Sequence, residues 1–228
     1  MSTPRQRARD QTMRDIVRIG REHLAAVGPA ALSLRAIARD LGVVSSAVYR
    51  YVTSRDELLT LLIVDAYDEL GDAVEAAVAA AGEDPRGRFL AAARAVRTWA
   101  VAEPSRYALV FGTPVPGYRA PGDRTTGPGT RVIVALLRIF DEAARAGQLV
   151  STALDIAPEL RADLARIREE YGSPLDDSQL VAATVAWTGI FGAVSFEVFG
   201  QYGTDTFAAP SALFEAQMEA LSAAVGLS

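Results

Sequence analysis

The sequence predicts an all-α protein, and three observations support that prediction. Apolar residues recur at spacings of three and four along most of the 228 residues, which is the period of a helix packed on one side. No segment shows the strict alternation of a strand, and no internal repeat is present. Half of the residues are hydrophobic and 22% are charged, so the chain can bury a sizeable core.

Local signals set the limits of the expected helices. Gly28 ends the first apolar stripe, and Ser33 and Gly42 flank a short second one as N-cap and stop. Ser54 and Glu57 have the spacing of a capping box at the start of a long helix. Helices are expected at about 8–27, 34–41, 44–51, 55–81, 85–103, 105–111, 130–147, 158–171, 175–201 and 210–225.

Two stretches stand out from the regular pattern. Residues 112–129 hold four Pro and five Gly, half of the 18 positions, which predicts a long loop. Residues 178–196 are 19 residues without a charge, near the length of a membrane-spanning helix. Their flanks are acidic and Thr, Gly and Ser dilute their apolarity, so we interpret them as a helix buried on most sides by protein.

The composition excludes several common kinds of enzyme active site. The chain has no Cys and a single His, His23, so it lacks a thiol nucleophile and cannot build a multi-histidine metal site. We interpret His23 as a surface or partly buried residue of the first helix. No Gly-rich phosphate loop is present, and the adjacent acid pairs mostly lie near predicted loops or helix ends. We therefore predict no catalytic residue, no metal, no cofactor and no enzymatic activity.

Charge is distributed unevenly. The net charge is −5 and all 23 basic residues are Arg, yet residues 1–56 hold 10 Arg against five acids. This basic end suits a polyanion, whereas the acidic remainder repels DNA and anionic lipid. Arg5, Arg7 and Arg9 are expected in an arm that contacts phosphates, or in a solvated tail. The first 23 residues contain no apolar signal segment, which predicts a cytoplasmic protein without a membrane anchor.

Residues 33–52 have the spacing of a helix-turn-helix. That motif needs a small residue where the helices touch, a Gly with positive φ in the turn, and a branched apolar residue in the second helix. Ala38, Gly42 and Val48 occupy these places, four and six residues apart. The spacing by itself also arises by chance, so the flanking residues decide.

The flanking segments carry a family resemblance. Residues 34–43 (LRAIARDLGV), 46–52 (SAVYRYV) and 54–59 (SRDELL) closely resemble the N-terminal DNA-binding domain of the TetR family of bacterial regulators. Residues 107–118 and 187–192 are similar to a subgroup with a Trp-His-Gly signature in the C-terminal domain. Phe191 stands where that histidine is usual.

The resemblance implies a homodimer on a palindromic operator, most often as a repressor, with a small molecule changing the half-site separation. With the charge boundary it predicts a DNA-binding domain at 1–56 and a regulatory and dimerisation domain at 57–228. The residues expected to face base edges are Ser45, Ser46, Ala47 and Arg50, of which Arg50 is the only long donor. Those expected to hold phosphates are Ser33, Arg35, Tyr49, Tyr51 and Arg55.

Some positions leave alternatives open. Hydrophobic packing is the alternative role for Tyr49 and Tyr51. Val44 stands where a Ser commonly caps the recognition helix, so Ser45 or Ser46 is expected to cap it instead. Arg55 replaces the family's usual Lys and keeps its charge.

The last two expected helices are predicted to form the dimer. Gly189, Ala193, Phe196 and Gly200 share one face, where small residues permit close approach. The final helix offers an apolar stripe of Leu213, Phe214, Met218 and Leu221. The alternative is that this stripe packs only within its own subunit.

Aromatic side chains from four expected helices either meet in a solid core or line a cavity. The resemblance strengthens the second possibility. We therefore predict a cavity for a small, mainly apolar effector, with the 112–129 loop as its lid. Its expected lining is Trp99, Tyr107, Phe111, Phe140, Trp187 and Phe191.

The leading interpretation is therefore a ligand-responsive transcriptional regulator. One alternative is an all-α small-molecule carrier or enzyme without operator binding. Another is a helical interaction protein that has lost operator binding.

Overall fold

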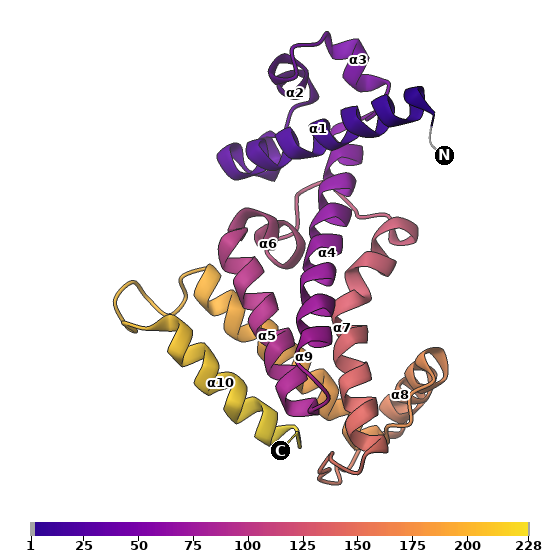
Figure 1. Cartoon of the computed structure of the whole chain (residues 1–228), viewed down its shortest axis with the longest axis vertical. Coiled ribbons are helices and arrows are strands. Elements are labelled where there is room, and N and C mark those ends of the chain that lie inside the picture. Colours follow the sequence, from indigo (N-terminus) through magenta and orange to yellow (C-terminus); the bar gives the residue numbers. More distant parts are fainter. Residues whose placement is uncertain (1–2, 228) are drawn as a thin grey trace. The chain divides into compact units, whose positions relative to one another are not determined.

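A computed structural model describes residues 3–227, and within them the chain is helical apart from turns, loops and an isolated bridge between Leu149 and Leu227 (Figure 1). The all-α prediction is confirmed. The helices are α1 (Pro4–Val27), the 3-10 turn η1 (Pro29–Ala31), α2 (Leu34–Asp40), α3 (Ser45–Tyr49), α4 (Arg55–Ala80), α5 (Pro85–Ala102), α6 (Pro104–Phe111), α7 (Gly122–Arg145), α8 (Pro158–Tyr171), α9 (Asp177–Val198) and α10 (Pro210–Ala224).

The chain divides into two compact units. Unit one comprises the described residues of Met1–Glu69 together with Glu103–Gly129, and unit two comprises Leu70–Ala102 with the described residues of Thr130–Ser228. Compactness therefore groups α6 and the start of α7 with the N-terminal helices. The predicted division at residue 56 concerned function and stays a prediction.

Unit one has one apolar core, to which α1, α2, α3 and α4 contribute. Ile16, Ile37 and Leu59 are fully buried in it, and α1 also contacts α6. Ser33 caps α2 as predicted, because its hydroxyl accepts a hydrogen bond from the Ala36 amide. These contacts hold the two short helices α2 and α3, which are too short to be stable alone.

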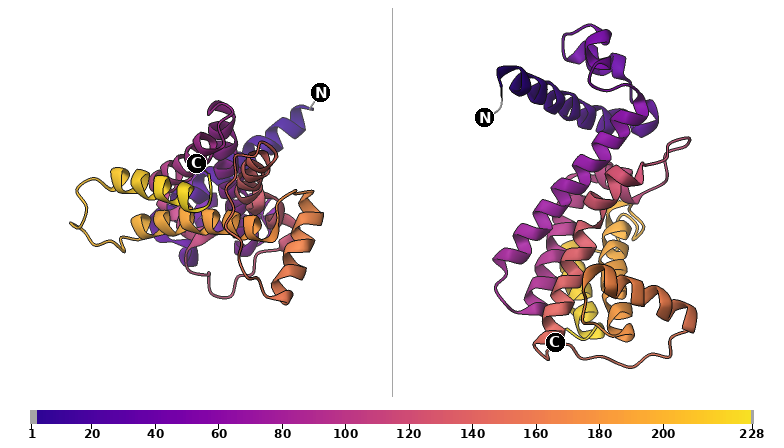
Figure 2. Two further views of the ribbon diagram at one scale, coloured as in Figure 1. Left: turned by 90° about the horizontal axis from the view of Figure 1, so that it is seen from below. Right: turned by 90° about the vertical axis from the view of Figure 1, so that its right-hand side faces the viewer.

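Unit two is organised around α5, α9 and α10, which contact one another, while α8 contacts α9 (Figure 2). Phe89, Phe140 and Phe214 are buried in its interior. Two guanidinium groups of α5 form paired hydrogen bonds with carboxylates on the neighbouring helices. Arg97 binds Glu197 of α9 and Arg94 binds Glu215 of α10.

The predicted long loop is shorter than expected, because α7 begins at Gly122 and contains Pro128. Gly127 has no Cβ, which relaxes the clash that a proline imposes on the residue before it. Gly129 packs against Tyr67, whose ring would lie 3.2 Å from an added Cβ. The prediction of a loop over 112–129 is therefore wrong for residues 122–129.

Helix α9 is buried on one side rather than on most sides. Its length and composition would allow it to span a membrane, yet only 22% of its apolar 18-residue stretch is buried within the protein. The buried stripe includes Ala183, Ala186 and Ile190, whereas Val185 and Phe196 are each 47% exposed. Within the single chain, α9 is therefore not buried on most sides as predicted.

Candidate DNA-binding surface

The helix-turn-helix of unit one is built as its spacing predicts. Ala38 and Val48 are each 1% exposed, at the contact between α2 and α3. Gly42 has a φ of 69° in the turn, and the Val43 amide donates to the Ala38 carbonyl oxygen at 3.0 Å. The space around Gly42 is open, so the backbone angle is what the turn requires of this residue.

The start of α3 differs from the expectation. Its N-cap is Val44, which makes no side-chain capping bond, and Ser45 and Ser46 are the first residues of the helix. The prediction that one of these serines caps α3 is wrong, because both have already entered the helical backbone. Neither hydroxyl is therefore committed to a cap.

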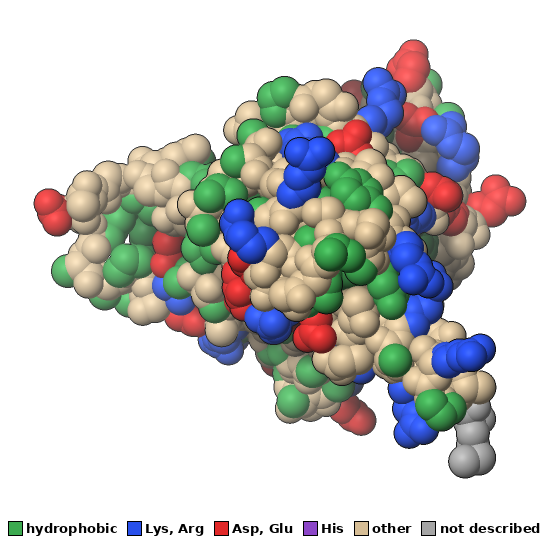
Figure 3. Space-filling view, turned by 90° about the horizontal axis from the view of Figure 1, so that it is seen from above, with side chains coloured by type: hydrophobic (Ala, Val, Ile, Leu, Met, Phe, Trp, Pro, Cys, Tyr) green, Lys and Arg blue, Asp and Glu red, His purple; other side chains and the backbone are tan. Residues whose placement is uncertain are grey.

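Polar and basic groups are exposed around α3. Arg35, Ser46, Tyr49 and Arg50 are exposed, and Ser45 and Ala47 are half-buried. Among residues 3–227, neither Arg35 nor Arg50 has an acidic group within ion-pair distance. Figure 3 shows arginine side chains distributed over the face seen from above. Uncompensated guanidinium groups beside an exposed helix are suited to phosphates and base edges.

Three of the expected phosphate contacts also have roles inside unit one. Ser33 caps α2, and Arg55 donates to the Pro29 carbonyl oxygen at 2.9 Å. Tyr51 packs against the core, and the Arg9 guanidinium lies 5.7 Å from its ring centroid. Packing, the alternative for Tyr51, is therefore observed, and the phosphate contacts of these residues stay predictions.

The basic N-terminal residues are part of a helix. Arg5, Arg7 and Arg9 are exposed in the first turns of α1, which Thr3 caps by accepting from the Gln6 amide. The prediction of an arm or tail is therefore wrong for the described residues. Their guanidinium groups have fixed positions relative to the core of unit one.

His23 has a structural role. Its Nε2 lies 2.6 Å from an Asp40 carboxylate oxygen, which joins α1 to the end of α2. This hydrogen bond lowers the pKa of Asp40. Within the described part of the chain, no group of three or more His, Asp and Glu side chains is placed to hold a metal ion.

An ionic cluster in unit one was not predicted from the sequence. Arg106 of α6 is 2% exposed and lies 3.0 Å from Asp65 and 2.9 Å from Glu69, both on α4. Arg21 of α1 binds the same two carboxylates. The cluster therefore ties three helices together. The only sequence signal for it is an arginine within the otherwise apolar run of α6.

Four of the six predicted effector-contacting aromatic residues form two contacting pairs. Tyr107 and Phe111 lie in unit one with ring centroids 5.1 Å apart. Trp187 and Phe191 lie in unit two with centroids 6.3 Å apart. Tyr107 is fully buried, as is Phe140, while Trp99 is 6% and Trp187 36% exposed. One cavity shared by the six stays a prediction.

The predicted dimer residues occupy different environments in the single chain. Phe214 and Met218 are each 2% exposed, so these two pack within their own subunit, which is the alternative stated for that stripe. Gly189 lies against Leu221, whose methyl group would be 2.6 Å from an added Cβ. Phe196 is exposed, as is Gly200.

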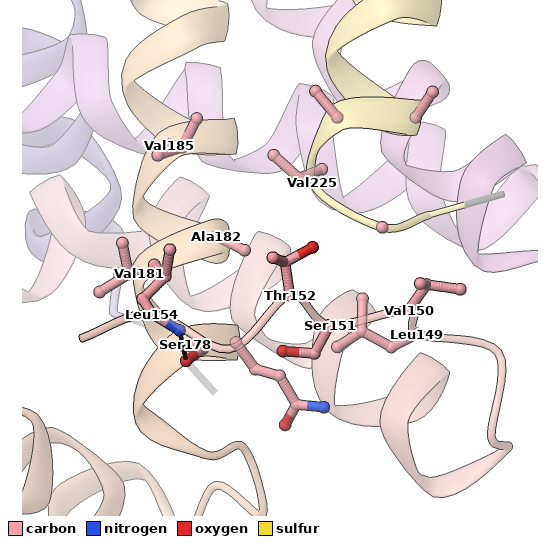
Figure 4. Close-up of a pocket in the computed structure, with 14 residues that line it drawn as sticks. Leu149, Val150, Ser151, Thr152, Leu154, Ser178, Val181, Ala182, Val185 and Val225 are labelled. Carbon is pink, nitrogen blue, oxygen red and sulfur yellow. Dashed lines mark hydrogen bonds between the residues drawn. The ribbon is translucent and has the colours of Figure 1, made fainter. Parts of the chain in front are cut away.

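A cavity of about 340 Å³ lies in unit two between residues 149–154, the start of α9 and the end of α10 (Figure 4). None of the six predicted aromatic residues lines it. The Leu154 amide donates to the Ser178 hydroxyl at 3.0 Å, which closes one wall. Val150 and Val185 of the lining are 66% and 47% exposed, so the cavity adjoins the exposed side of α9.

The packing of α2 on α3 and the turn at Gly42 define a helix-turn-helix protein, with exposed arginines on α2 and directly after α3. Residues 16–62 match the bacterial regulatory proteins of the tetR family, and residues 89–221 match the tetracyclin repressor-like C-terminal domain. The HTH-type transcriptional regulator Rv1816 of Mycobacterium tuberculosis is 50% identical over 224 residues, 96% of this chain and 94% of that protein.

Two solved structures share the fold over nearly the whole chain. The regulatory protein SCO4313 is 37% identical with a TM-score of 0.77, covering 96% of this chain and 98% of that one. A Rhodococcus sp. RHA1 protein of unknown function is 25% identical with a TM-score of 0.66, covering 91% and 93%. The chain belongs to the TetR family of transcriptional regulators, and it is not an enzyme. The finer resemblance to a Trp-His-Gly subgroup stays a prediction.

Proposed function

We propose that the protein is a ligand-responsive repressor that binds a palindromic operator as a homodimer in the cytoplasm. The observation that carries DNA recognition is the exposed α3 with Arg35 and Arg50 beside it and no acidic partner for either among the described residues. Arg50 is the long donor expected to read a guanine, and Arg35 and Tyr49 are expected to hold the neighbouring phosphates.

The test of DNA recognition is fluorescence anisotropy with duplexes selected from a random pool by the wild-type protein. Arg50→Ala is expected to cost about 1–3 kcal/mol on the selected duplex and to relax specificity at one base step. Arg18→Ala is the matched control, because it removes an exposed α1 arginine that pairs with Glu22. Equal affinity of the wild type for selected and scrambled duplexes at physiological salt would refute sequence-specific binding.

Salt dependence separates the alternatives. A protein that neutralises several phosphates loses affinity steeply as salt rises, because binding releases counterions from the duplex. A small-molecule carrier or an interaction protein that has lost operator binding shows no such affinity to lose. A flat response between low and physiological salt would favour those alternatives.

The exposed side of α9 supports the dimer. A helix that is apolar all round is normally covered all round, yet Val185, Trp187 and Phe196 of α9 are 36–47% exposed. On α10 the exposed positions include Ala212, Ala216 and Ala220, small residues that permit close helix approach. We propose that a second copy covers these two faces.

Gly192 offers a test that leaves the subunit intact. It is exposed on α9, and an added Cβ meets nothing within 4 Å. Gly192→Arg is therefore expected to give a folded monomer in sedimentation, because the new charge would be buried in the interface. Ala25→Arg on exposed α1 is the matched control and is expected to sediment as a dimer. A dimeric Gly192→Arg protein would contradict the proposed interface.

The proposed effector is small and mainly apolar. Trp99 and Trp187 are the only two tryptophans, so their fluorescence reports on the aromatic residues of unit two. Titration with apolar compounds is expected to change this signal together with DNA affinity. A compound that changes DNA affinity without changing the fluorescence would place its site away from these two residues.

A further inference from the structure

The exposed side of α9 carries one continuous stripe, which we name the α9 stripe. Its residues are exposed and follow one another at spacings of three and four, so they share one face: Val185, Thr188, Gly192, Phe196 and Phe199. Residues 178–196 contain no charge at all. A helix without a polar, charged face is normally covered by other protein on every side.

The α9 stripe begins beside a hollow. Val185 lines the cavity of about 340 Å³ that lies between residues 149–154, the start of α9 and the end of α10 (Figure 4). Among the described residues that line this cavity, none has a charged or aromatic side chain. An engineered cavity of about 150 Å³ accommodates benzene, so this space is large enough for about two aromatic rings.

The α9 stripe ends in an aromatic cluster of Phe196, Phe199, Tyr202 and Phe207. The Tyr202 ring lies in the connection between α9 and α10, with centroids 5.4 Å from Phe196 and 5.5 Å from Phe207. The Gln217 side chain of α10 donates to the Tyr202 hydroxyl at 3.1 Å, which fixes the connection relative to α10. The three phenylalanine side chains are nevertheless 39–47% exposed.

The cavity and the aromatic cluster lie at opposite ends of the α9–α10 pair. Figure 1 shows the α9–α10 connection at one end of α10 and the last described residues at the other. Val185 and Phe199 are 14 residues apart, about 21 Å along a helix, so the aromatic cluster does not reach the cavity of its own subunit. A partner of complementary shape presents rings at one end and a hollow at the other. A second copy of this chain has that shape.

Gly192 lies at the middle of the α9 stripe, seven residues after Val185 and seven before Phe199. In a two-fold symmetric pair of antiparallel helices that cross at this residue, each position meets the position equally far on the other side. Phe199 of one copy then faces Val185 of the other, beside its cavity. A stripe of this length is covered from end to end only by a shallow crossing, about 20° as in helix bundles.

A parallel arrangement of the two copies of α9 fits the same surfaces poorly. It brings each cavity against the other cavity and each aromatic cluster against its copy, so both hollows stay empty. The core of a protein interface is packed as densely as a protein interior, which favours the arrangement that fills the hollows. The antiparallel arrangement also brings opposite ends of the two helix dipoles together.

We propose that α9 packs antiparallel to its copy, crossing it at Gly192, and that the aromatic cluster of each subunit fills the cavity of the other. The inference rests on the proposed homodimer and specifies which surfaces meet and in which direction. Glu197 lies next to Phe196 but is paired with Arg97 of its own subunit, so it brings no unpaired charge to the interface.

The first experiment uses sedimentation of the wild type and crosslinking of single-cysteine variants. A monomeric wild type would refute the proposed homodimer itself. The chain has no Cys, so each introduced thiol is the only one present. Gly192→Cys is expected to form a disulfide-linked dimer on oxidation with diamide, because the two copies meet there and a disulfide needs Cα atoms within about 7 Å. Ala162→Cys, exposed on α8, is the control and is expected to stay unlinked.

The direction of the helices is tested at Val185 and Phe199. Val185→Cys alone and Phe199→Cys alone are expected to stay unlinked, whereas the double variant is expected to link into dimers. About 21 Å separates the two positions in one chain, so the double variant has no internal disulfide to form. Linking of Val185→Cys alone would show a parallel arrangement and overturn the proposal. A protein that sediments as a dimer but does not link through Gly192→Cys, or through the double variant, would also overturn it.

Phe207→Ala tests whether the aromatic cluster fills the partner's cavity. Phe207 is 42% exposed in the single subunit, so its truncation leaves the subunit core intact. The dimer dissociation constant is expected to rise at least about tenfold, as for a ring seated in an interface pocket. Leu160→Ala on α8, which is also 42% exposed, is the control and is expected to leave it unchanged.

Ala182→Trp tests the same contact from the other side. Ala182 lines the cavity, so an indole there occupies the space that the partner's rings would fill. The dissociation constant is expected to rise at least about tenfold. A wild-type dissociation constant in both Phe207→Ala and Ala182→Trp would overturn the seating of the aromatic cluster in the cavity.

Discussion

Replacing Arg106 by Met removes the buried cation that α6 contributes to unit one. Arg106 is 2% exposed and lies 3.0 Å from Asp65 and 2.9 Å from Glu69. It also donates to the Asp65 backbone oxygen at 3.2 Å. Met retains the apolar stem of the side chain, so the substitution tests the charge and its hydrogen bonds rather than the packing.

The expected loss follows from the burial of each partner. Removing one member of a buried ion pair costs about 3–5 kcal/mol, because the partner charges remain without compensation. Here Asp65 and Glu69 are 23% and 40% exposed and keep Arg21, so water screens part of the loss. We therefore expect about 2–4 kcal/mol of lost unfolding free energy and a fall in Tm of roughly 4–16 °C.

Urea unfolding followed by circular dichroism measures this change. Arg94→Met is the matched control, because its pair with Glu215 joins two helices but both side chains are more than 40% exposed. That control is expected to lose less than about 1 kcal/mol. If both variants lose the same free energy, burial of the Arg106 cluster does not stabilise the fold and the reasoning fails.

Three further outcomes are expected. The hydrogen bonds from Arg94 lower the pKa of Glu215, so the pair stabilises the fold above the ordinary glutamate pKa and loses this contribution as pH falls through the lowered value. The unfolding free energies of Glu215→Gln and wild type should therefore differ at pH 7 and converge as pH falls below the lowered pKa of Glu215; a constant difference would contradict this. Gly226→Ala should cost about 2–3 kcal/mol, because φ is 87° and an added Cβ would lie 1.9 Å from the Val150 oxygen; an unchanged Tm would show that the terminal bridge is dispensable. Gly42→Ala should cost about 1–2 kcal/mol from its positive φ alone, and calorimetry showing no loss would mean that the turn adopts another backbone conformation.

Local signals in the sequence were sufficient for most of the fold. Helix ends at Gly28 and Pro104, and the cap at Ser33, agree with the structure within a few residues. Such signals act through the backbone of their own neighbourhood. The helical start of α7 was missed because a glycine- and proline-rich composition favours a loop, whereas Gly127 and the packing of Gly129 on Tyr67 permit a helix around Pro128.

The candidate sites were predicted unevenly, for a related reason. The helix-turn-helix lies within 20 residues, so its spacing together with the flanking segments placed Ala38, Gly42 and Val48 correctly. Arg106 and Asp65 are 41 residues apart, and no local pattern shows that they meet. An apolar stripe likewise identifies a face but not its partner, so Phe214 was assigned to a second subunit although it packs within its own.

The composition of unit one determines what an isolated fragment of this protein is able to do. A fragment ending within α4 would lack Val115 and Arg106, which are supplied by Glu103–Gly129. Its core would be left with a gap, and Asp65 and Glu69 would lose one of their cations. Joining the N-terminal helices of this protein to another effector domain therefore requires the 103–129 segment as well. Exchange of N-terminal helices between family members is likewise restricted to partners in which this segment packs into the same core.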